Sequence, residues 1–241
     1  MFNFYRERVT MKATHTNADM SHQNGLVYKM GVFFNSLKEN GVLPTIRRIG
    51  QRFSYKVKGV DFSTQNIFDL TRTGEYQEHG TALVSTSVEF LRRLLDDLES
   101  VIDKPLEKDV FVDYGSGKGA AIIHAKKLGF ERTIGVEFAK ELHEQAELNI
   151  KKLNLKNVES LYADATTYTL PNNITLIYFF NPFDELVMTK VIENIMVQKE
   201  QFENDVYVIY GNASCNVLQE HFTLLKQVQY PSGARAEFYK I

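Results

Sequence analysis

The sequence is poor in the residues that cross-link or interrupt a small fold, with one cysteine and five prolines among 241 residues. Cys215 cannot form an internal disulfide, and a cysteine-only metal site needs three or four thiolates. Five prolines and 14 glycines are too few for a collagen-like or low-complexity chain. The composition is that of an ordinary globular protein, with 44% hydrophobic and 24% charged residues. The chain is long enough for one sizeable core and an appendage.

Long hydrophobic runs are absent too. The longest, around residues 176–180, falls far short of the roughly 20 residues that a membrane helix requires. The N-terminus also lacks the basic-then-apolar pattern of a signal peptide. We therefore expect a cytoplasmic protein with no membrane partner.

Charge is present but unevenly distributed. The formal net charge is −2, yet residues 1–60 hold 10 Lys and Arg against 3 Asp and Glu, a net +7, which leaves −9 for residues 61–241. A basic front end can mark an anionic partner, although charged helices commonly just present solvated faces. Little aromatic interleaving accompanies the basic cluster, whereas a nucleic-acid groove usually has both. The cluster consists of Arg47, Arg48, Arg52, Lys56 and Lys58.

The first third of the chain is predicted to be an arm followed by helices. Residues 1–25 are polar and without periodicity, whereas 26–38 and 43–53 carry apolar residues at helical spacing. Residues 60–84 show little period and are predicted to be rich in loops. We therefore expect residues 1–84 to form a mobile arm and a helical extension or cap. The apolar register of the second helix consists of Leu43, Ile46, Ile49 and Phe53.

From Ser85 onward the pattern becomes an alternation of helices and strands. Thr86-x-x-Glu89 has the spacing of a capping box and opens a helix that runs to Ile102. Strands that alternate with helices of this length indicate βαβ units and a parallel sheet. The expected strands are 110–113, 133–137, 158–162, 176–180, 206–210, 226–230 and 235–241, and the expected helices between them cover 120–128, Leu142–Leu153, Val187–Ile195 and Val217–Leu225.

The last two predicted strands are joined by Pro231-Ser232-Gly233, a turn signal, so the final strand must run antiparallel to its predecessor. The predicted fold is therefore α/β: a Rossmann-like, mostly parallel sheet with a C-terminal antiparallel hairpin strand and a helical N-terminal extension. Residues 85–241 form the domain that carries the sheet.

The sharpest motif is the glycine turn that leaves the first strand, Asp113-Tyr114-Gly115-Ser116-Gly117-Lys118-Gly119. Its position between a strand and a helix is the context of a ligand-binding turn. The spacing G-x-G-x-G is neither the dinucleotide fingerprint G-x-G-x-x-G nor a Walker A loop, and Lys118 stands in the wrong place for the latter. The acid at the strand end argues against a nearby pyrophosphate and favours a cationic or hydroxyl-rich ligand.

Two further acids end the next two strands. Glu137 lies 18 residues past Gly119, where a carboxylate can accept from both ribose hydroxyls, and Asp164 follows the third strand. Each acid alone is also explained as a helix cap or a solvated loop residue. Because acids at three successive strand ends meet at one edge of a parallel sheet, the combination indicates a binding site.

On these residues the stretch 85–241 resembles the class I S-adenosylmethionine-dependent methyltransferases. The terminal hairpin, which distinguishes that family from dehydrogenases, is part of the resemblance. It looks most like uncharacterised bacterial members and, more distantly, the non-SET protein-lysine methyltransferases. S-adenosyl-L-methionine is therefore the implied cofactor. The cofactor-binding residues that the resemblance implies are Asp113, Tyr114, Gly115, Ser116, Gly117 and Gly119 for the methionyl side, Glu137 for the ribose, and Phe138, Asp164 and Ala165 for the adenine.

The run Asn181-Pro182-Phe183 after the fourth strand is similar to the N-P-P-[YF] motif of methyltransferases that act on nitrogen. In that motif the Asn side chain and a proline carbonyl accept hydrogen bonds from the target amine, and the aromatic ring covers it. Here Phe183 stands where the second proline would be. An equally weighted alternative is that Asn-Pro ends the strand and caps a helix near Asp184. With Phe179 and Phe180, Phe183 is also a candidate wall for a dry site.

Three functions remain open. The first is methyl transfer to a nitrogen of a protein side chain or small amine, which must be neutral to react. The second is nucleic-acid methylation, and the third is nucleotide binding or scaffolding without catalysis. No metal site is expected, because the six histidines are scattered without ligand spacing. His124 is expected to be a satisfied core residue and Cys215 a small buried hydrophobe.

Overall fold

The computed structural model describes residues 41–63, 70, 71 and 85–241. The expected arm at 1–25, the expected helix at 26–38 and most of the expected loop at 60–84 lie outside the described residues. The chain divides into two compact units, Met1–Arg47 and Arg48–Ile241. The description that follows concerns the second unit and the helix α3, Val42–Val57, that leads into it.

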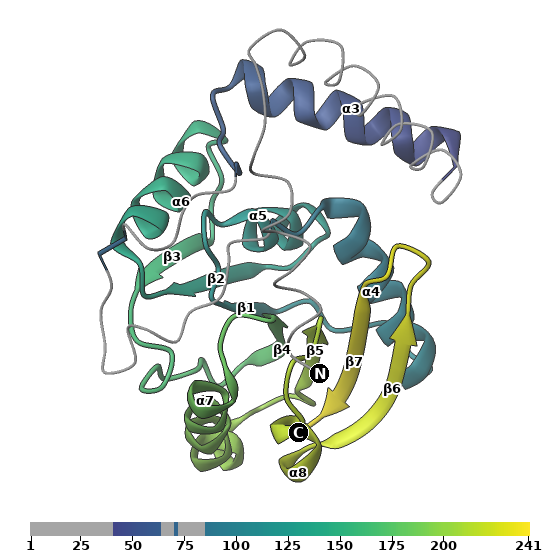
Figure 1. Cartoon of the computed structure of the whole chain (residues 1–241), viewed down its shortest axis with the longest axis vertical. Helices are drawn as coiled ribbons and strands as arrows, with labels where there is room; N and C mark the ends of the chain where they lie inside the picture. The colour runs from purple at the N-terminus through teal and green to yellow at the C-terminus, as the bar shows by residue number, and fades with distance from the viewer. Residues whose placement is uncertain (1–40, 64–69, 72–84) are drawn as a thin grey trace, which may run out of the picture. The chain divides into compact units, whose positions relative to one another are not determined.

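The second unit is built on one seven-stranded sheet, in the order β3-β2-β1-β4-β5-β7-β6 (Figure 1). The first five strands pair in parallel, and β7 pairs antiparallel with both β5 and β6. The predicted Rossmann-like sheet with an antiparallel C-terminal hairpin is thus confirmed. The strands are β1 Val110–Tyr114, β2 Arg132–Glu137, β3 Val158–Tyr162, β4 Ile174–Phe180, β5 Tyr207–Gly211, β6 Thr223–Gln229 and β7 Arg235–Lys240.

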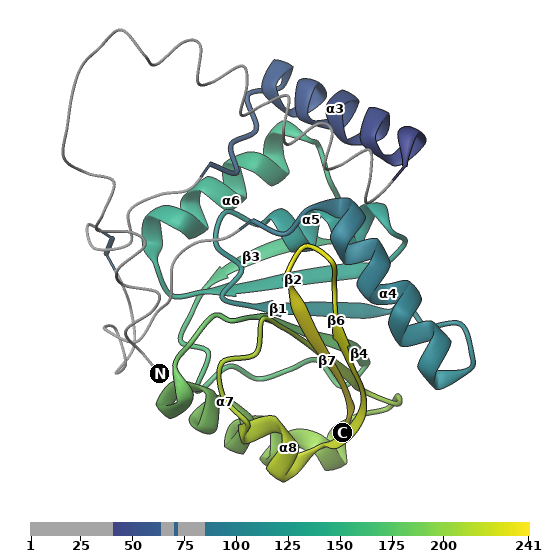
Figure 2. The same ribbon diagram turned by 45° about the vertical axis from the view of Figure 1, so that its right-hand side comes forward.

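Helices cover both faces of this sheet (Figure 2). Helices α4, α5 and α6 contribute to the hydrophobic cluster on one face, and α7 and α8 to the cluster on the other. Because both faces are buried, the central strands read as nearly continuous apolar runs rather than as alternating ones. The helices are α4 Val88–Ile102, α5 Ala120–Lys127, α6 Lys140–Lys152, α7 Glu185–Gln198 with a 3₁₀ turn at Lys199–Gln201, and α8 Val217–His221.

Strand β1 shows how this arrangement positions the site. Val112 and Tyr114 belong to the cluster on the α7 and α8 side, and Phe111 to the cluster on the α4 and α5 side. Because successive side chains alternate across a strand, Asp113 falls on the same side as Phe111. The order of strands reverses beside β1, which has β2 on one side and β4 on the other. In open parallel sheets, ligands bind at such a switch point, outside the carboxyl ends of the strands.

The start of α4 differs from the prediction by one residue. Ser87, not Thr86, is the N-cap, and its hydroxyl accepts a hydrogen bond from the backbone N–H of Phe90 at 3.2 Å. The Thr86 hydroxyl is instead 3.0 Å from the hydroxyl of Tyr178 on β4. The local spacing predicts Thr86 as the cap of this helix. Its hydroxyl bonds instead to a buried residue that is distant in sequence.

The C-terminal hairpin was also predicted with shifted bounds. The last helix ends at His221, and Leu225, which was expected to lie on it, belongs to β6. The antiparallel relation is right, but β7 is inserted between β5 and β6. The strand that ends the chain is therefore an interior strand, and Phe238 on it is fully buried.

Helix α3 forms as predicted but does not bury the predicted face. Ile46, Ile49 and Phe53 are all exposed, and Tyr55 is the residue that packs inward. The Tyr55 ring lies 5.3 Å from that of Phe62 and 6.0 Å from that of His124 on α5. Helical periodicity thus located the helix but not the side that is buried.

Candidate active site

The glycine turn lies at the carboxyl end of β1, and its backbone explains its composition. Gly115, Gly117 and Gly119 all have positive φ, between 54° and 80°, a region that side chains disfavour. The amides of Gly115 and Ser116 both donate to the carbonyl of Val136, at 2.9 and 3.2 Å, so the turn is tied to β2. The turn also contacts the end of β4, because a Cβ at Gly115 would lie 2.5 Å from Pro182 Cβ.

Glu137, at the end of β2, is buried against this turn. One carboxylate oxygen accepts from the N–H of Gly117 at 2.7 Å, and the other from the N–H of Ala139 at 2.8 Å. The backbone bonds fix the orientation of the acid that was predicted to hold ribose.

Asp113 ends β1 almost completely buried. Burial, and then the negative charge of Glu137, raise the pKa of this carboxyl well above its usual range. Such a group is costly unless a positive charge compensates it. The effect of Glu137 on Asp113 shows that the structure brings these two predicted acids together at the carboxyl ends of β1 and β2.

Two residues of the same stretch are placed differently. The Tyr114 ring is fully buried and stacks on Phe179 at 5.2 Å between centroids, so its side chain belongs to the core on the α7 and α8 side. The Ser116 hydroxyl is buried and finds no hydrogen-bond partner in the part of the chain that the structure describes. A buried hydroxyl without a partner costs stability, which favours a ligand at Ser116.

The third acid follows β3. Asp164 is half-buried and accepts from the backbone and hydroxyl of Thr166, at 2.9 and 2.7 Å, in an Asx-type turn. Ala165 is buried beside it, and Phe138 at the end of β2 is half-buried. Since the carboxyl ends of β2 and β3 are adjacent, these three residues share the sheet edge with Glu137.

The Asn-Pro-Phe run leaves β4 at the same edge. Asn181 has φ 47°, a left-handed conformation that asparagine tolerates better than most residues. It does not cap the following helix, because Asp184 is the N-cap of α7 and accepts from the Val187 N–H. Phe183 is buried in the core with Val187.

Only one of the three phenylalanines expected to wall a dry site is partly accessible. Phe179 is fully buried and Phe183 nearly so, whereas Phe180 is half-buried. The Phe180 ring lies 6.0 Å from that of Phe90 at the start of α4. Phe179 is therefore a core residue, and the aromatic group nearest the open edge comes from Phe180.

Sequence reasoning missed a polar cluster behind the turn. Lys118 is 6% exposed, and its ammonium lies 2.7 Å from Asp61 Oδ2 and 3.3 Å from the Ser63 hydroxyl. The Asn149 amide donates to the carbonyls of Asp61 and Lys118 and accepts from the Asp61 N–H. Two features of the sequence could have indicated this cluster: a lysine inside a glycine turn, and an asparagine on the apolar face of α6.

This cluster fixes the charge on Asp61. Burial alone would raise the pKa of Asp61, but hydrogen bonds from Lys118 and Ser63 outweigh it and lower the pKa to about 2. The Asp61 carboxyl is therefore ionised at physiological pH. Lys118 does not face the strand ends as a phosphate ligand would; it ties the segment around Asp61 to the turn.

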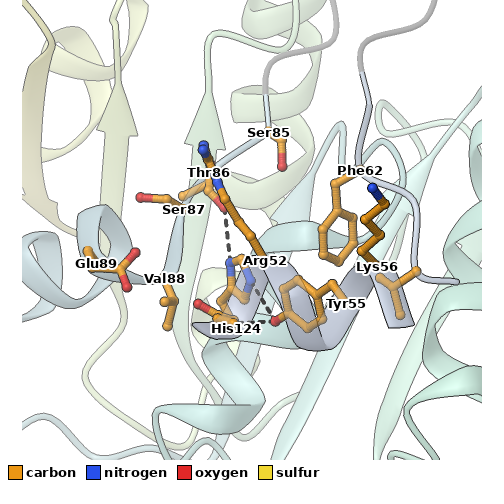
Figure 3. A pocket seen from close by; sticks show the side chains of 12 residues that line it. Arg52, Tyr55, Lys56, Phe62, Ser85, Thr86, Ser87, Val88, Glu89 and His124 are labelled. Carbon is orange, nitrogen blue, oxygen red and sulfur yellow. Dashed lines mark hydrogen bonds between the residues drawn. The ribbon is translucent and has the colours of Figure 1, made fainter. Parts of the chain in front are cut away.

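A pocket of about 360 Å³ lies beside α5, lined by residues of α3, the segment 60–62 and residues 85–89 (Figure 3). Its buried histidine, His124, has both ring nitrogens engaged. Because a carbonyl only accepts, Nδ1 donates to Thr86 O at 3.0 Å, and the Tyr55 hydroxyl donates to Nε2 at 3.0 Å. Burial, followed by the charge of Lys127, lowers the pKa of His124 to about 4. His124 is therefore a satisfied, neutral core residue, as predicted.

The buried Cys215 is free, also as predicted. Within the described residues, no group of His, Cys, Asp or Glu is arranged to hold a metal ion. In the same part of the chain no helix combines the length and the hydropathy needed to cross a bilayer.

Comparison with known proteins gives structural likenesses only. No family model and no curated protein matches the sequence. The chain is similar to a SAM-dependent methyltransferase from Aquifex aeolicus, with 18% identity and a TM-score of 0.48 over 65% of this chain and 100% of that one. An RNA methyltransferase from Salinibacter ruber, in complex with S-adenosyl-L-homocysteine, shows 19% identity and a TM-score of 0.45 over 66% and 94%.

A third likeness is to magnesium protoporphyrin IX methyltransferase from Synechocystis PCC 6803 with bound SAM. It shows 13% identity and a TM-score of 0.49 over 64% of this chain and 78% of that one. At TM-scores below 0.5 these likenesses decide neither the substrate nor the chemistry, for which the residues of the site must supply the support.

Proposed function

We propose that the chain is an S-adenosylmethionine-dependent methyltransferase. The observation that carries this proposal is the pair of buried acids, Asp113 and Glu137, at a turn whose three glycines all have positive φ. A dinucleotide or a nucleoside triphosphate would bring phosphate charge against Asp113. A nucleoside with hydroxyls and an ammonium group, and with no phosphate, matches both acids.

The residues present fit that cofactor. In the proposed complex Asp113 and the turn Gly115–Gly119 hold the methionyl part, Glu137 accepts from the ribose hydroxyls, and Asp164 with the Ala165 amide binds the adenine. Phe138 packs on the adenine face, and the buried Ser116 hydroxyl gains a partner. When bound, S-adenosylmethionine supplies a methyl group on a positively charged sulfur. Its ammonium compensates the charge of Asp113 and so favours the ionised carboxylate.

The acceptor is proposed to be a nitrogen of a protein side chain or small amine. Pro182 packs against Gly115 at the end of β4, which supports Asn181 and Pro182 as the groups that accept hydrogen bonds from the amine. A lysine amine, with a pKa near 10.4, must shed its proton before it attacks, and a dry environment lowers that pKa. Phe180 provides an apolar wall there, with Phe183 buried behind it as support.

A second acceptor class, nucleic acid, is favoured by one observation: the net +7 of residues 1–60. The acceptor class can be tested with tritiated methyl transfer into cell extract followed by protease or nuclease. Protease-sensitive label supports a protein amine, and nuclease-sensitive label supports nucleic acid. Label in neither, with tight cofactor binding, favours a binding protein without catalysis.

The cofactor itself is tested by calorimetry with S-adenosylmethionine and S-adenosylhomocysteine. Glu137→Ala should weaken binding at least tenfold, since two hydrogen bonds to a charged group are lost. Glu159→Ala is the matched control, because this acid lies on the neighbouring strand β3 and pairs with Arg132 instead. If neither compound binds the wild-type chain, the proposed function is wrong; if Glu137→Ala binds normally, only its ribose role is lost.

A further inference from the structure

The pocket beside α5 shares no residue with the proposed cofactor site. Its volume of about 360 Å³ is within the range of small-molecule sites. The Tyr55 hydroxyl and both ring nitrogens of His124 are already engaged in hydrogen bonds. The Thr86 hydroxyl is paired with that of Tyr178. A ligand in this pocket would therefore be recognised by the other residues that line it.

Glu89 is the acidic residue of the pocket. It lies in the first turn of α4, where a negative charge is favourable. One carboxylate oxygen, Oε2, is shielded from water and has no hydrogen-bond partner within the described residues. Burial, together with the charge of Glu89, raises the pKa of Tyr55 to about 12, so this carboxylate acts on another wall of the same pocket. A carboxylate that has lost part of its solvation without gaining a donor is stabilised by a positive charge in the pocket.

The source of that positive charge is best supplied by an amine. A metal ion would need further ligands, and within the described residues no group of three or more His, Cys, Asp and Glu could hold one. A protonated amine needs only one carboxylate and brings N–H donors with its charge.

The opposite side of the pocket is basic. Figure 3 shows Lys56, on α3, across the pocket from Glu89. Arg52 also lines the pocket but already has an interaction partner, so Lys56 is the cation assigned to a ligand. A ligand with only a positive charge would be repelled by Lys56, whereas a zwitterion matches both charges.

Apolar side chains complete the wall. The Phe62 ring is half-buried and lies 5.3 Å from the ring of Tyr55 and 5.8 Å from that of His124, so it is held in place. Val60 and Val88 are half-buried and line the same pocket. These side chains offer apolar contact to a ligand that lies between the two charges.

We propose that this pocket binds a free α-amino acid with an apolar side chain. Its ammonium group lies at Glu89, its carboxylate at Lys56, and its side chain against Phe62 and the two valines. The proposal does not depend on methyl transfer, because no residue of the pocket belongs to the proposed cofactor site.

The test is calorimetry of the full-length protein with L-leucine and with two analogues that each lack one charge. L-leucine is expected to bind. 4-Methylpentanoate, which lacks the ammonium group, should bind at least tenfold more weakly, because the charged partner of Glu89 is gone. 3-Methylbutylamine, which lacks the carboxylate, should bind about two- to fivefold more weakly, because only the exposed contact with Lys56 is lost.

Substitutions locate the binding. Glu89→Gln should weaken L-leucine binding at least tenfold, and Lys56→Gln about two- to fivefold. Glu185→Gln is the matched control, because Glu185 lies exposed in the first turn of α7 and should leave the affinity unchanged. Glu137→Ala, in the proposed cofactor site, should also leave it unchanged, which separates this proposal from the proposed function.

Each other outcome overturns the proposal. If L-leucine does not bind, the pocket holds no amino acid. If it binds equally well to the Glu89 variant, or loses affinity in the Glu137 variant, it occupies another site. If 3-methylbutylamine binds as tightly as L-leucine, the ligand is a simple amine and Lys56 has no role. Unchanged melting temperatures of the unliganded variants confirm that a lost affinity does not reflect a lost fold.

Discussion

At the scale of single residues, the glycine turn is held from several directions. Glu137 accepts from the Gly117 N–H on one side, while the Asn149 amide donates to the Lys118 carbonyl on the other. Asp61 then pairs with the Lys118 ammonium. Backbone with positive φ at three positions has little intrinsic preference for one shape, so these bonds decide the shape that the cofactor would meet.

Lys118→Met should therefore weaken S-adenosylhomocysteine binding about five- to tenfold, which corresponds to about 1 kcal/mol. The loss arises because Asp61 is left without its cation and the segment 61–63 without its tie to the turn. Calorimetry measures the affinity, and thermal melting separates it from global stability.

Asp61→Asn tests the same contact from the other end. If the pair acts as a unit, Lys118→Met with Asp61→Asn should cost little more than Lys118→Met alone. Lys190→Met, which removes the exposed pair with Glu193 on α7, should leave affinity unchanged. Full additivity of the two substitutions would contradict the proposed coupling.

At the scale of elements, the ends of helices are decided by their neighbours. The Thr86 hydroxyl bonds to Tyr178 on β4 and leaves the cap of α4 to Ser87. Helix α3 is likewise held through Tyr55, whose ring contacts Phe62 and His124, rather than through the exposed Ile49 and Phe53. Both features depend on residues distant in sequence.

Ser87→Ala should destabilise the protein by about 1 kcal/mol and speed hydrogen exchange at the Phe90 amide, which loses its acceptor. Thr86→Val should also reduce stability, since the Tyr178 hydroxyl loses its partner, but should leave exchange at Phe90 unchanged. Urea unfolding and amide exchange distinguish the two. If exchange at Phe90 is faster only in the Thr86 variant, Thr86 and not Ser87 is the cap of α4.

His124 makes the contact between α3 and α5 sensitive to pH. Its pKa is about 4 in the folded chain and about 6.5 when unfolded, so protonation favours unfolding. The stabilising effect is complete above pH 6.5 and is lost as the pH falls towards 4, by at most about 3 kcal/mol. Unfolding free energies of His124→Gln, measured over this range, should show a shallower decline than those of the wild type. His221→Gln, at an exposed position, should decline as the wild type does.

At the scale of the whole molecule, the last strand is central to stability although it ends the chain. Strand β7 pairs with β5 and β6, and Phe238 on it is fully buried on the α4 and α5 side. Strand β6, which precedes it, is the edge of the sheet. Truncation near the C-terminus would therefore remove interior structure, not an appendage.

Phe238→Ala should lower the free energy of unfolding by about 3–5 kcal/mol, the cost of a large cavity in a packed core. Leu224→Ala, at a position 41% exposed on β6, should cost under about 1 kcal/mol. Denaturant melts of both variants test the strand order. Equal costs would argue that β6, not β7, is the interior strand.

How far the sequence predicts this structure depends on how local the signal is. The strands, the glycine turn and the acids at Glu137 and Asp164 follow from patterns within a few residues, and the structure contains every predicted strand with its bounds shifted by at most three residues. The bond between Thr86 and Tyr178 joins residues 92 apart, and that between Lys118 and Asp61 joins residues 57 apart. No periodicity reports such contacts. The roles of the site residues stay predictions.

By itself, then, the sequence determined the alternation of strands and helices, the antiparallel end and the three acids at one sheet edge. The single cysteine excluded an internal disulfide, and the lack of long apolar runs argued against a membrane-spanning helix. Neither absence shows which residues are exposed on the surface. Only the tertiary structure decided that Ile46, Ile49 and Phe53 of α3 are exposed, that β7 lies inside the sheet and that Lys118 pairs with Asp61. The physical reason is that periodicity records which residues share a face, whereas burial depends on what packs against that face.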